Sequence, residues 1–162
     1  MERLYTGFTP GDTHFVANHF MVGMDGWIYA NTGSGPDAVS VTHPEVKAKL
    51  SSGIFRFKPD GSAIEQVGSK GGNAFGMDIT SDGELYFGQA TSGSPVQHVV
   101  LPEWILSKGK VGNAGSVESV IAGRKVVRGD MPDRVPYMQI DVVGGYSSAT
   151  ASTVSSSIAS SR

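Results

Sequence analysis

The chain has 162 residues, a formal net charge of −2 at pH 7 and no cysteine, which excludes disulfides and thiolate metal sites. The small negative charge offers no electrostatic surface for nucleic acid or for an anionic membrane. Glycine accounts for 22 residues and charged residues for only 17%, so we expect many turns and few solvated helices. No apolar run reaches the ~18 residues of a membrane span, and Met1 to Leu4 begins no signal peptide.

The first third of the chain predicts a loop, a hairpin and an insert. Residues 1–13 contain the turn signal Pro10-Gly11-Asp12 and no alternation, which indicates a loop. Apolar residues alternate unevenly from Phe15 to Tyr29 on both sides of Asp25-Gly26, which predicts two strands. Residues 32–52 include two glycines and two prolines that interrupt any regular pattern, so we expect an inserted loop there.

The centre of the chain predicts two successive β-hairpins. Alternating apolar residues flank Asp60-Gly61 over residues 54–67 and Asp82-Gly83 over residues 77–87. Asp-Gly pairs favour tight reversals because both residues accept the positive φ that a type I′ turn requires. The glycine-rich connection 68–73 is predicted to be neither helix nor strand.

A repeat indicates how these hairpins are arranged. The motif Asp-Gly-X-(Leu or Ile)-Tyr begins at Asp25 and again at Asp82, 57 residues later. One blade of a β-propeller takes about 40 to 50 residues, so the spacing suits consecutive blades with residues 32–52 inserted after the first. At about 45 residues a blade, the chain holds roughly three blades, too few to close a ring. We therefore expect an all-β partial propeller that is part of a longer protein.

The last third is predicted to contain weaker elements and a tail. Residues 147–162 include eight serines and two threonines, too few large apolar groups to offset the entropy of ordering. We expect a partial propeller domain over residues 1–146 and a Ser/Thr-rich tail, truncated or disordered, over residues 147–162. The expected elements between them are strands at 99–101, 117–121, 125–127 and 137–143 and one helical turn at 103–106.

Five motifs follow one another in a distinctive order, at residues 17–20, 23–33, 55–61, 72–76 and 97–102. Their order resembles that in the membrane-bound dehydrogenase-like propellers, which are similar to the glucose/sorbosone dehydrogenases that use pyrroloquinoline quinone. This resemblance implies a six-bladed propeller in the parent protein, exported to the periplasm or outside the cell, and in large proteins a neighbouring cytochrome c module. The substrate would be a small sugar or alcohol.

The resemblance also implies a site. A histidine before the first Gly-Asp turn acts in that family as general base, a task that suits a neutral imidazole. His14 lies at about the right distance, and His19 is the second catalytic candidate. Asn73 occupies the place of a cofactor-binding asparagine, but Gly72 stands where the family has an arginine that pairs with the anionic quinone. Quinone and calcium are thus the cofactors that the resemblance implies, and Gly72 argues against them.

Other interpretations of the same residues remain open. The leading expectation is a fragment of a quinone-dependent sugar or alcohol dehydrogenase-like propeller, in which the histidine takes a hydroxyl proton while hydride passes to the quinone. The alternative, which Gly72 favours, is a non-catalytic propeller module that binds a glycan or a protein partner. A complete small β-sandwich is the third possibility. Asp25, Asp60 and Asp82 each precede a glycine, so they are expected to set turns rather than to act as paired acids. His98 precedes an apolar run, and we expect it to make a structural hydrogen bond at a strand end.

Overall fold

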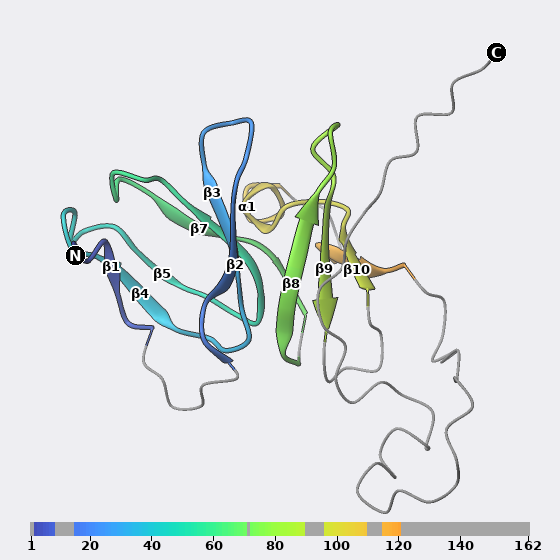
Figure 1. Ribbon diagram of the computed structural model, residues 1–162, viewed down its shortest axis with the longest axis horizontal. Coiled ribbons are helices and arrows are strands. Elements are labelled where there is room, and N and C mark those ends of the chain that lie inside the picture. Colours follow the sequence, from blue (N-terminus) through green and yellow to red (C-terminus); the bar gives the residue numbers. More distant parts are fainter. Residues whose placement is uncertain (1, 9–14, 71, 90–95, 110–114, 121–162) are drawn as a thin grey trace, which may run out of the picture.

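The computed structural model describes residues 2–8, 15–70, 72–89, 96–109 and 115–120. Within these ranges the chain is all-β, as predicted, with antiparallel strands and one short helix (Figure 1). No helix in the described ranges is long and apolar enough to cross a lipid bilayer. The strands predicted at 125–127 and 137–143 and the tail 147–162 lie outside the described residues.

Two four-stranded antiparallel sheets form most of the described structure. The first sheet has the order β2 (Asn18–Val22), β3 (Ile28–Thr32), β6 (Gly53–Phe57), β7 (Ile64–Ser69). The second sheet has the order β8 (Ala74–Ile79), β9 (Leu85–Gln89), β10 (Val96–Val99), β11 (Val117–Ser119). Each sheet follows chain order, which is the meander expected of a propeller blade. Closure into a ring stays a prediction.

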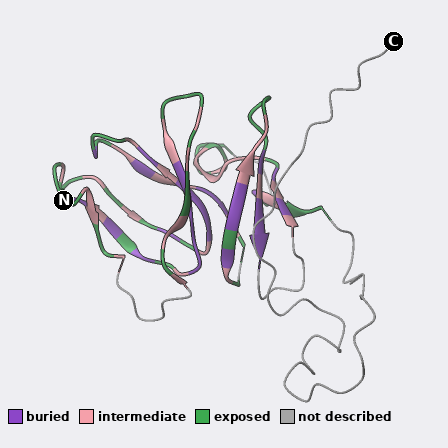
Figure 2. Cartoon of the chain, in the orientation of Figure 1, coloured by how far each residue is buried: buried purple, intermediate pink, exposed green. Residues whose placement is uncertain are grey.

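A third, smaller sheet packs on the face of the first sheet that is opposite to the second sheet. It has the order β1 (Tyr5–Thr6), β4 (Asp37–Ser40), β5 (Lys47–Lys49). Figure 1 shows the three sheets as successive layers, with the first sheet in the middle, and Figure 2 shows the buried residues concentrated along its strands and those of the second sheet. The predictions of loops at residues 1–13 and 32–52 were therefore wrong at three short strands, because pairing between distant segments stabilises strands that no local pattern marks.

The two faces of the first sheet bury separate hydrophobic cores. One core lies between the first and second sheets and joins Ile54 and Val67 to Met77 and Phe87. The other joins Phe55 on β6 to residues of the small sheet and the insert, including Ala38 and Leu50. Consecutive residues of β6 thus enter opposite cores, as the two-residue period of a strand requires.

The Asp-Gly reversals lie where they were predicted, but their turn type differs. Asp25-Gly26 joins β2 to β3 and Asp82-Gly83 joins β8 to β9, so the repeat marks equivalent turns in the two large sheets. Among the described residues only His19 has a positive φ without being glycine, which excludes the type I′ turn at Asp25 and Asp82. The amide of Gly26 donates to the carbonyl of Gly23, and that of Gly83 to Thr80. Glycine at positive φ after such a turn is the three-residue hairpin loop with a bulge.

Helix α1 (Glu103–Leu106) matches the predicted helical turn and packs on the outer strand β7 of the first sheet. The Arg56 guanidinium carbon lies 4.2 Å from the ring centroid of Trp27 and 4.8 Å from that of Trp104 in α1. Arg56 also donates hydrogen bonds to Asp25 at 3.0 Å and to Glu65 at 2.7 Å. This set of contacts attaches the helix to the first sheet. The predicted strand at 99–101 is displaced, since β10 ends at Val99.

Candidate functional site

The predicted catalytic base His14 lies outside the described residues, but its neighbour Phe15 is described. The carbonyl of Phe15 accepts hydrogen bonds from the amide of Gly33 at 3.2 Å and from the hydroxyl of Ser34 at 3.2 Å. The hydroxyl of Thr32 donates to the same carbonyl at 3.4 Å. The chain directly after His14 is therefore fixed against the loop that follows β3.

Asn73, the predicted cofactor-binding residue, lies against the same loop. A Cβ built on Gly33 would be 2.0 Å from the Oδ1 of Asn73 and 3.0 Å from the Cα of Phe15. No side chain larger than hydrogen fits at Gly33 unless Asn73 moves. The structure thus brings together two segments that the sequence singled out separately, the one after His14 and the one around Asn73, and Gly33 lies between them.

Two buried amides at this end of the sheets were not predicted. Asn31 on β3 and Gln89 on β9 are both 0% exposed. Neither the Oδ1 nor the Nδ2 of Asn31 has a hydrogen-bond partner in the described part of the chain, and the Oε1 of Gln89 has none there either. The Nε2 of Gln89 donates to the carbonyl of Lys70 at 2.9 Å. In the sequence, an amide that will be buried in a strand looks the same as an exposed one. The sequence therefore carried no signal for these two residues.

We call this region the amide end of the two sheets and define it by residues that share two properties. All of them are uncharged, and all lie at the ends of β3 and β9 or in the segments that precede β2 and β8. Their side chains offer carboxamides and hydroxyls but neither a charge nor a nucleophile. The amide end consists of Phe15, Asn31, Thr32, Gly33, Ser34, Asn73 and Gln89.

His19, the second catalytic candidate, is not one of the residues of the amide end. It lies on β2, is exposed, and has φ of 54°. The register of β2 against β3 shifts between Asn18 and Met21, so His19 is part of a β-bulge. Bulges re-aim side chains. The structure positions the imidazole on the surface of the strand.

The turn aspartates and His98 have the structural roles expected of them. The Oδ1 of Asp25 accepts from the amide of Trp27 at 3.2 Å, and that of Asp60 from the amide of Ser62 at 3.0 Å. The Oδ1 of Asp82 accepts from the hydroxyl of Thr80. His98 bonds to Glu84 through Nε2 and stacks on Tyr86 with 4.6 Å between ring centroids, on the second sheet.

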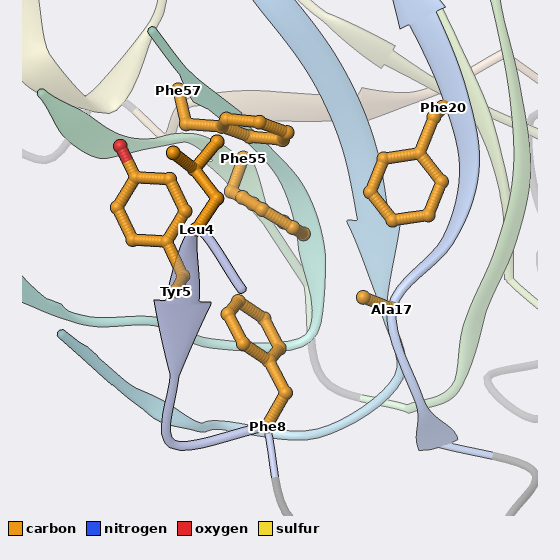
Figure 3. A pocket seen from close by; sticks show the side chains of 7 residues that line it. All are labelled: Leu4, Tyr5, Phe8, Ala17, Phe20, Phe55 and Phe57. Carbon is orange, nitrogen blue, oxygen red and sulfur yellow. The ribbon is translucent and has the colours of Figure 1, made fainter. Parts of the chain in front are cut away.

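An apolar pocket of about 310 Å³ lies elsewhere, where the small sheet meets β2 (Figure 3). The aromatic rings in Figure 3 line it from several elements, and Phe20 on β2 remains 59% exposed. Its one hydroxyl belongs to Tyr5 and donates to the carbonyl of Ala63 at 2.8 Å. Burial, together with the nearby Asp60 carboxylate, raises the pKa of Tyr5 to about 12, so this phenol stays protonated near neutral pH. The pocket offers packing surface, without acid or base chemistry. Its lining residues are Leu4, Tyr5, Phe8, Ala17, Phe20, Phe55 and Phe57.

The described side chains fit the implied cofactors poorly. Pyrroloquinoline quinone is a tricarboxylate, and the amide end has no cation to pair with it, because Gly72 replaces the arginine and Lys70 is exposed. Within the described ranges no three His, Asp or Glu side chains gather to hold a metal ion such as calcium. The chemistry that the amide end does support is hydrogen bonding to neutral groups.

Comparison with known proteins places the chain in a family. A family model described as a domain of unknown function, DUF7133, matches residues 1–159. The chain belongs to the DUF7133 family. No curated protein and no solved structure matches it. For this DUF7133 chain the all-β architecture is thus defined by its own structure, and its function has to be argued from its own residues.

Proposed function

We propose that the chain is a β-propeller module that binds a neutral, hydroxyl-bearing ligand, a sugar, an alcohol or a glycan, at the amide end. One observation carries the proposal: Phe15, Gly33 and Asn73, which are far apart in the sequence, meet there with no charged side chain among them. Carboxamides both donate and accept hydrogen bonds, which matches the two-way bonding of hydroxyl groups. Ligands of propellers and other closed β-folds commonly lie where the loops of several strands converge.

The Gly33→Ala variant tests this proposal. The new methyl group would lie 2.0 Å from the Asn73 Oδ1, too close for both to stay in place, and would displace that side chain. Titration calorimetry of the full chain with a panel of sugars, polyols and oligosaccharides is expected to show binding by the wild type and at least a tenfold loss in the variant. Gly115→Ala is the matched control, because its Cβ would meet only an ordinary contact at 3.7 Å. Absence of binding to every member of the panel would reject the proposal.

A second candidate function is quinone-dependent oxidation of the bound hydroxyl, with His14 as the base that takes its proton. The position of Phe15 favours it, because the residue after His14 is held at the amide end. The quinone, when bound, would supply the hydride acceptor. Since the described residues lack a cation for its carboxylates, this function needs a charged partner from another part of the protein.

Dye reduction separates the two candidates. The full chain is mixed with quinone, calcium and the same ligand panel, beside His14→Ala and a His43→Ala control. His43 is a suitable control because it pairs with Glu45 in the insert, away from the amide end. Quinone-dependent turnover that is lost only in His14→Ala would establish the enzyme. Zero turnover with no quinone retained would reject the enzyme function, and the binding module would remain as the proposed function.

A further inference from the structure

Asn31, whose amide has no partner in the described part of the chain, and Gln89, whose Oε1 has none there, both face the space between the large sheets. Asn31 pairs across the sheet with Ile54, and side chains paired in this way point to one face. Ile54 belongs to the core between the first and second sheets. Gln89 is two residues from Phe87, so it shares the face of Phe87, which enters the same core. Both carboxamides therefore face the interface between the sheets.

The backbone links these residues to the amide end. Asn31 also pairs with Asn18 on β2, whose Oδ1 accepts from the amide of Gly76 on β8 at 3.3 Å. Gln89 pairs with Ala74 at the start of β8. The side chain of Asn31 is thus located where β2, β3 and β8 approach one another, and Gln89 lies at the same end of the second sheet.

Leaving these atoms without partners has a cost. A buried amide atom that makes no hydrogen bond loses its hydration without compensation, and proteins satisfy more than nine in ten such groups. Proteins keep such costs chiefly where a ligand or an ordered water completes the site. Both polar side-chain atoms of Asn31, the donor Nδ2 and the acceptor Oδ1, are open in the described part of the chain, and the Oε1 of Gln89 adds an acceptor. A single O–H group can accept from the Asn31 Nδ2 and donate to one of the two carboxamide oxygens.

We propose that Asn31 and Gln89 bind one O–H group of the neutral hydroxyl-bearing ligand between the two sheets. This inference rests on the function proposed above and deepens it, because it names an inner binding point and the ligand class. Full burial of both amides limits the bound group to a hydroxyl or hydroxymethyl arm. The uncharged surroundings discriminate against a carboxylate, so glucose is expected to bind and gluconate is not.

The experiment compares Asn31→Leu with wild type in the full chain. Leucine has the same branched arrangement of side-chain heavy atoms and no polar atom, so it removes the binding point without opening a cavity. The variant is expected to keep or raise the melting temperature and to bind glucose at least tenfold more weakly. Gln66→Leu is the matched control, because both amide atoms of Gln66 have partners, at Ser51, Ile54 and Gly68. It is expected to lower the melting temperature.

Side-chain amide NMR distinguishes a ligand hydroxyl from a bound water. The NH₂ resonances of Asn31 are expected to shift with glucose and to remain unchanged with gluconate. Persistent magnetisation transfer from water to Asn31 in the presence of saturating glucose, with unchanged affinity in Asn31→Leu, would show a structural water and overturn the inference while the proposed function stands. Wild-type protein that binds no sugar at all would instead overturn the proposed function and this inference with it.

Discussion

Arg56 shows how one residue can connect several elements of this fold. Its side chain is 13% exposed and lies over two indole rings, that of Trp27 in the β2–β3 turn and that of Trp104 in α1. Its guanidinium also bonds to Asp25, which lies in the first hairpin turn, and to Glu65 on β7. A planar guanidinium can make all these contacts at once, since its edge carries the hydrogen bonds and its faces the aromatic rings.

Replacement of Arg56 by methionine is expected to lower the free energy of unfolding by about 1 to 3 kcal/mol. Methionine retains the buried stem but leaves Asp25 and Glu65 without their cation. These carboxylates remain partly exposed, at 41% and 31%, so water replaces part of the lost interaction and the cost stays below that of a fully buried pair. Urea unfolding monitored by tryptophan fluorescence measures this change in the free energy of unfolding. Lys58→Met, which removes a cation over Trp27 alone, should cost much less.

The carboxyl of Asp25 predicts how stability changes with pH. Partial burial opposes its ionisation, but hydrogen bonds from Tyr29 and the Trp27 amide and the charge of Arg56 outweigh that effect, so its pKa lies below the ordinary value of 3.8. A depressed pKa contributes stability that is present above the unfolded pKa and is lost as the pH falls through the folded one. The stability difference between wild type and Asp25→Asn should therefore be constant near neutral pH and shrink below about pH 4.

Urea midpoints from pH 2.5 to 7 check this pH dependence. In an Arg56→Met background the same Asp25→Asn substitution should have a smaller effect, because one of the groups that holds the carboxylate charged is gone. An equal effect in both backgrounds would show that Arg56 does not contribute to the shift.

At the scale of elements, the two large sheets repeat one hairpin design. Gly26 has φ of 73° and Gly83 of 89°, and each closes the turn between the first two strands of its sheet. A Cβ at either glycine would meet nothing within 4 Å, so the only cost of alanine there is its backbone conformation. Because Gly26 and Gly83 have equivalent positions, conformations and surroundings, we expect alanine to have the same effect on the free energy of unfolding at both.

Gly26→Ala and Gly83→Ala are each expected to reduce the free energy of unfolding by about 1 kcal/mol, the cost of a non-glycine residue in the left-handed region. Chemical denaturation of both variants provides the measurement. Ser81→Ala, in the second of these turns, is the control for a change without a φ cost. A much larger effect at only one glycine would mean that the two turns are not structurally equivalent.

The sequence anticipated most of these elements because their signals are local. Alternation marked the cores of β6 to β9, since side chains of a strand must point alternately to opposite faces. The prediction that residues 68–73 form no strand was wrong at Gly68 and Ser69, which belong to β7, and β8 begins at Ala74, three residues before the predicted start. The turn type was wrong because Asp25 and Asp82 stay at negative φ and the glycine alone takes the positive value. Asp-Gly is compatible with both loops, and the choice depends on how the flanking strands pair.

At the scale of the whole molecule, β2 presents an apolar edge that no strand among the described residues covers. It is the first strand in the order of its sheet, and Val22 and Met24 at its end are 78% and 82% exposed. Phe20 on the same strand borders the apolar pocket and is 59% exposed. An unpaired strand edge with apolar side chains promotes association. The propeller hypothesis predicts that a further sheet covers this face in the parent protein.

Val22→Lys is expected to reduce self-association of the isolated chain, because a charge on an edge strand opposes pairing with another strand. Light scattering over a range of protein concentrations measures the effect. Val100→Lys is the control, since Val100 is also exposed, at 49%, but lies beyond β10. Equal reduction by both variants would show that general charge, rather than the β2 edge, governs association.

The sequence by itself determined that this chain is all-β, where its central hairpins reverse and where the helical turn of α1 forms, because these features depend on residues close together in the chain. Only the tertiary structure decided the rest. Tyr5 pairs with Ser40, Phe15 and Asn73 meet at Gly33, and Asn31 enters the space between two sheets. Such contacts join segments whose separation no local pattern encodes, and they arise only when packing brings the sheets together. The candidate binding site consists almost entirely of contacts of this second kind.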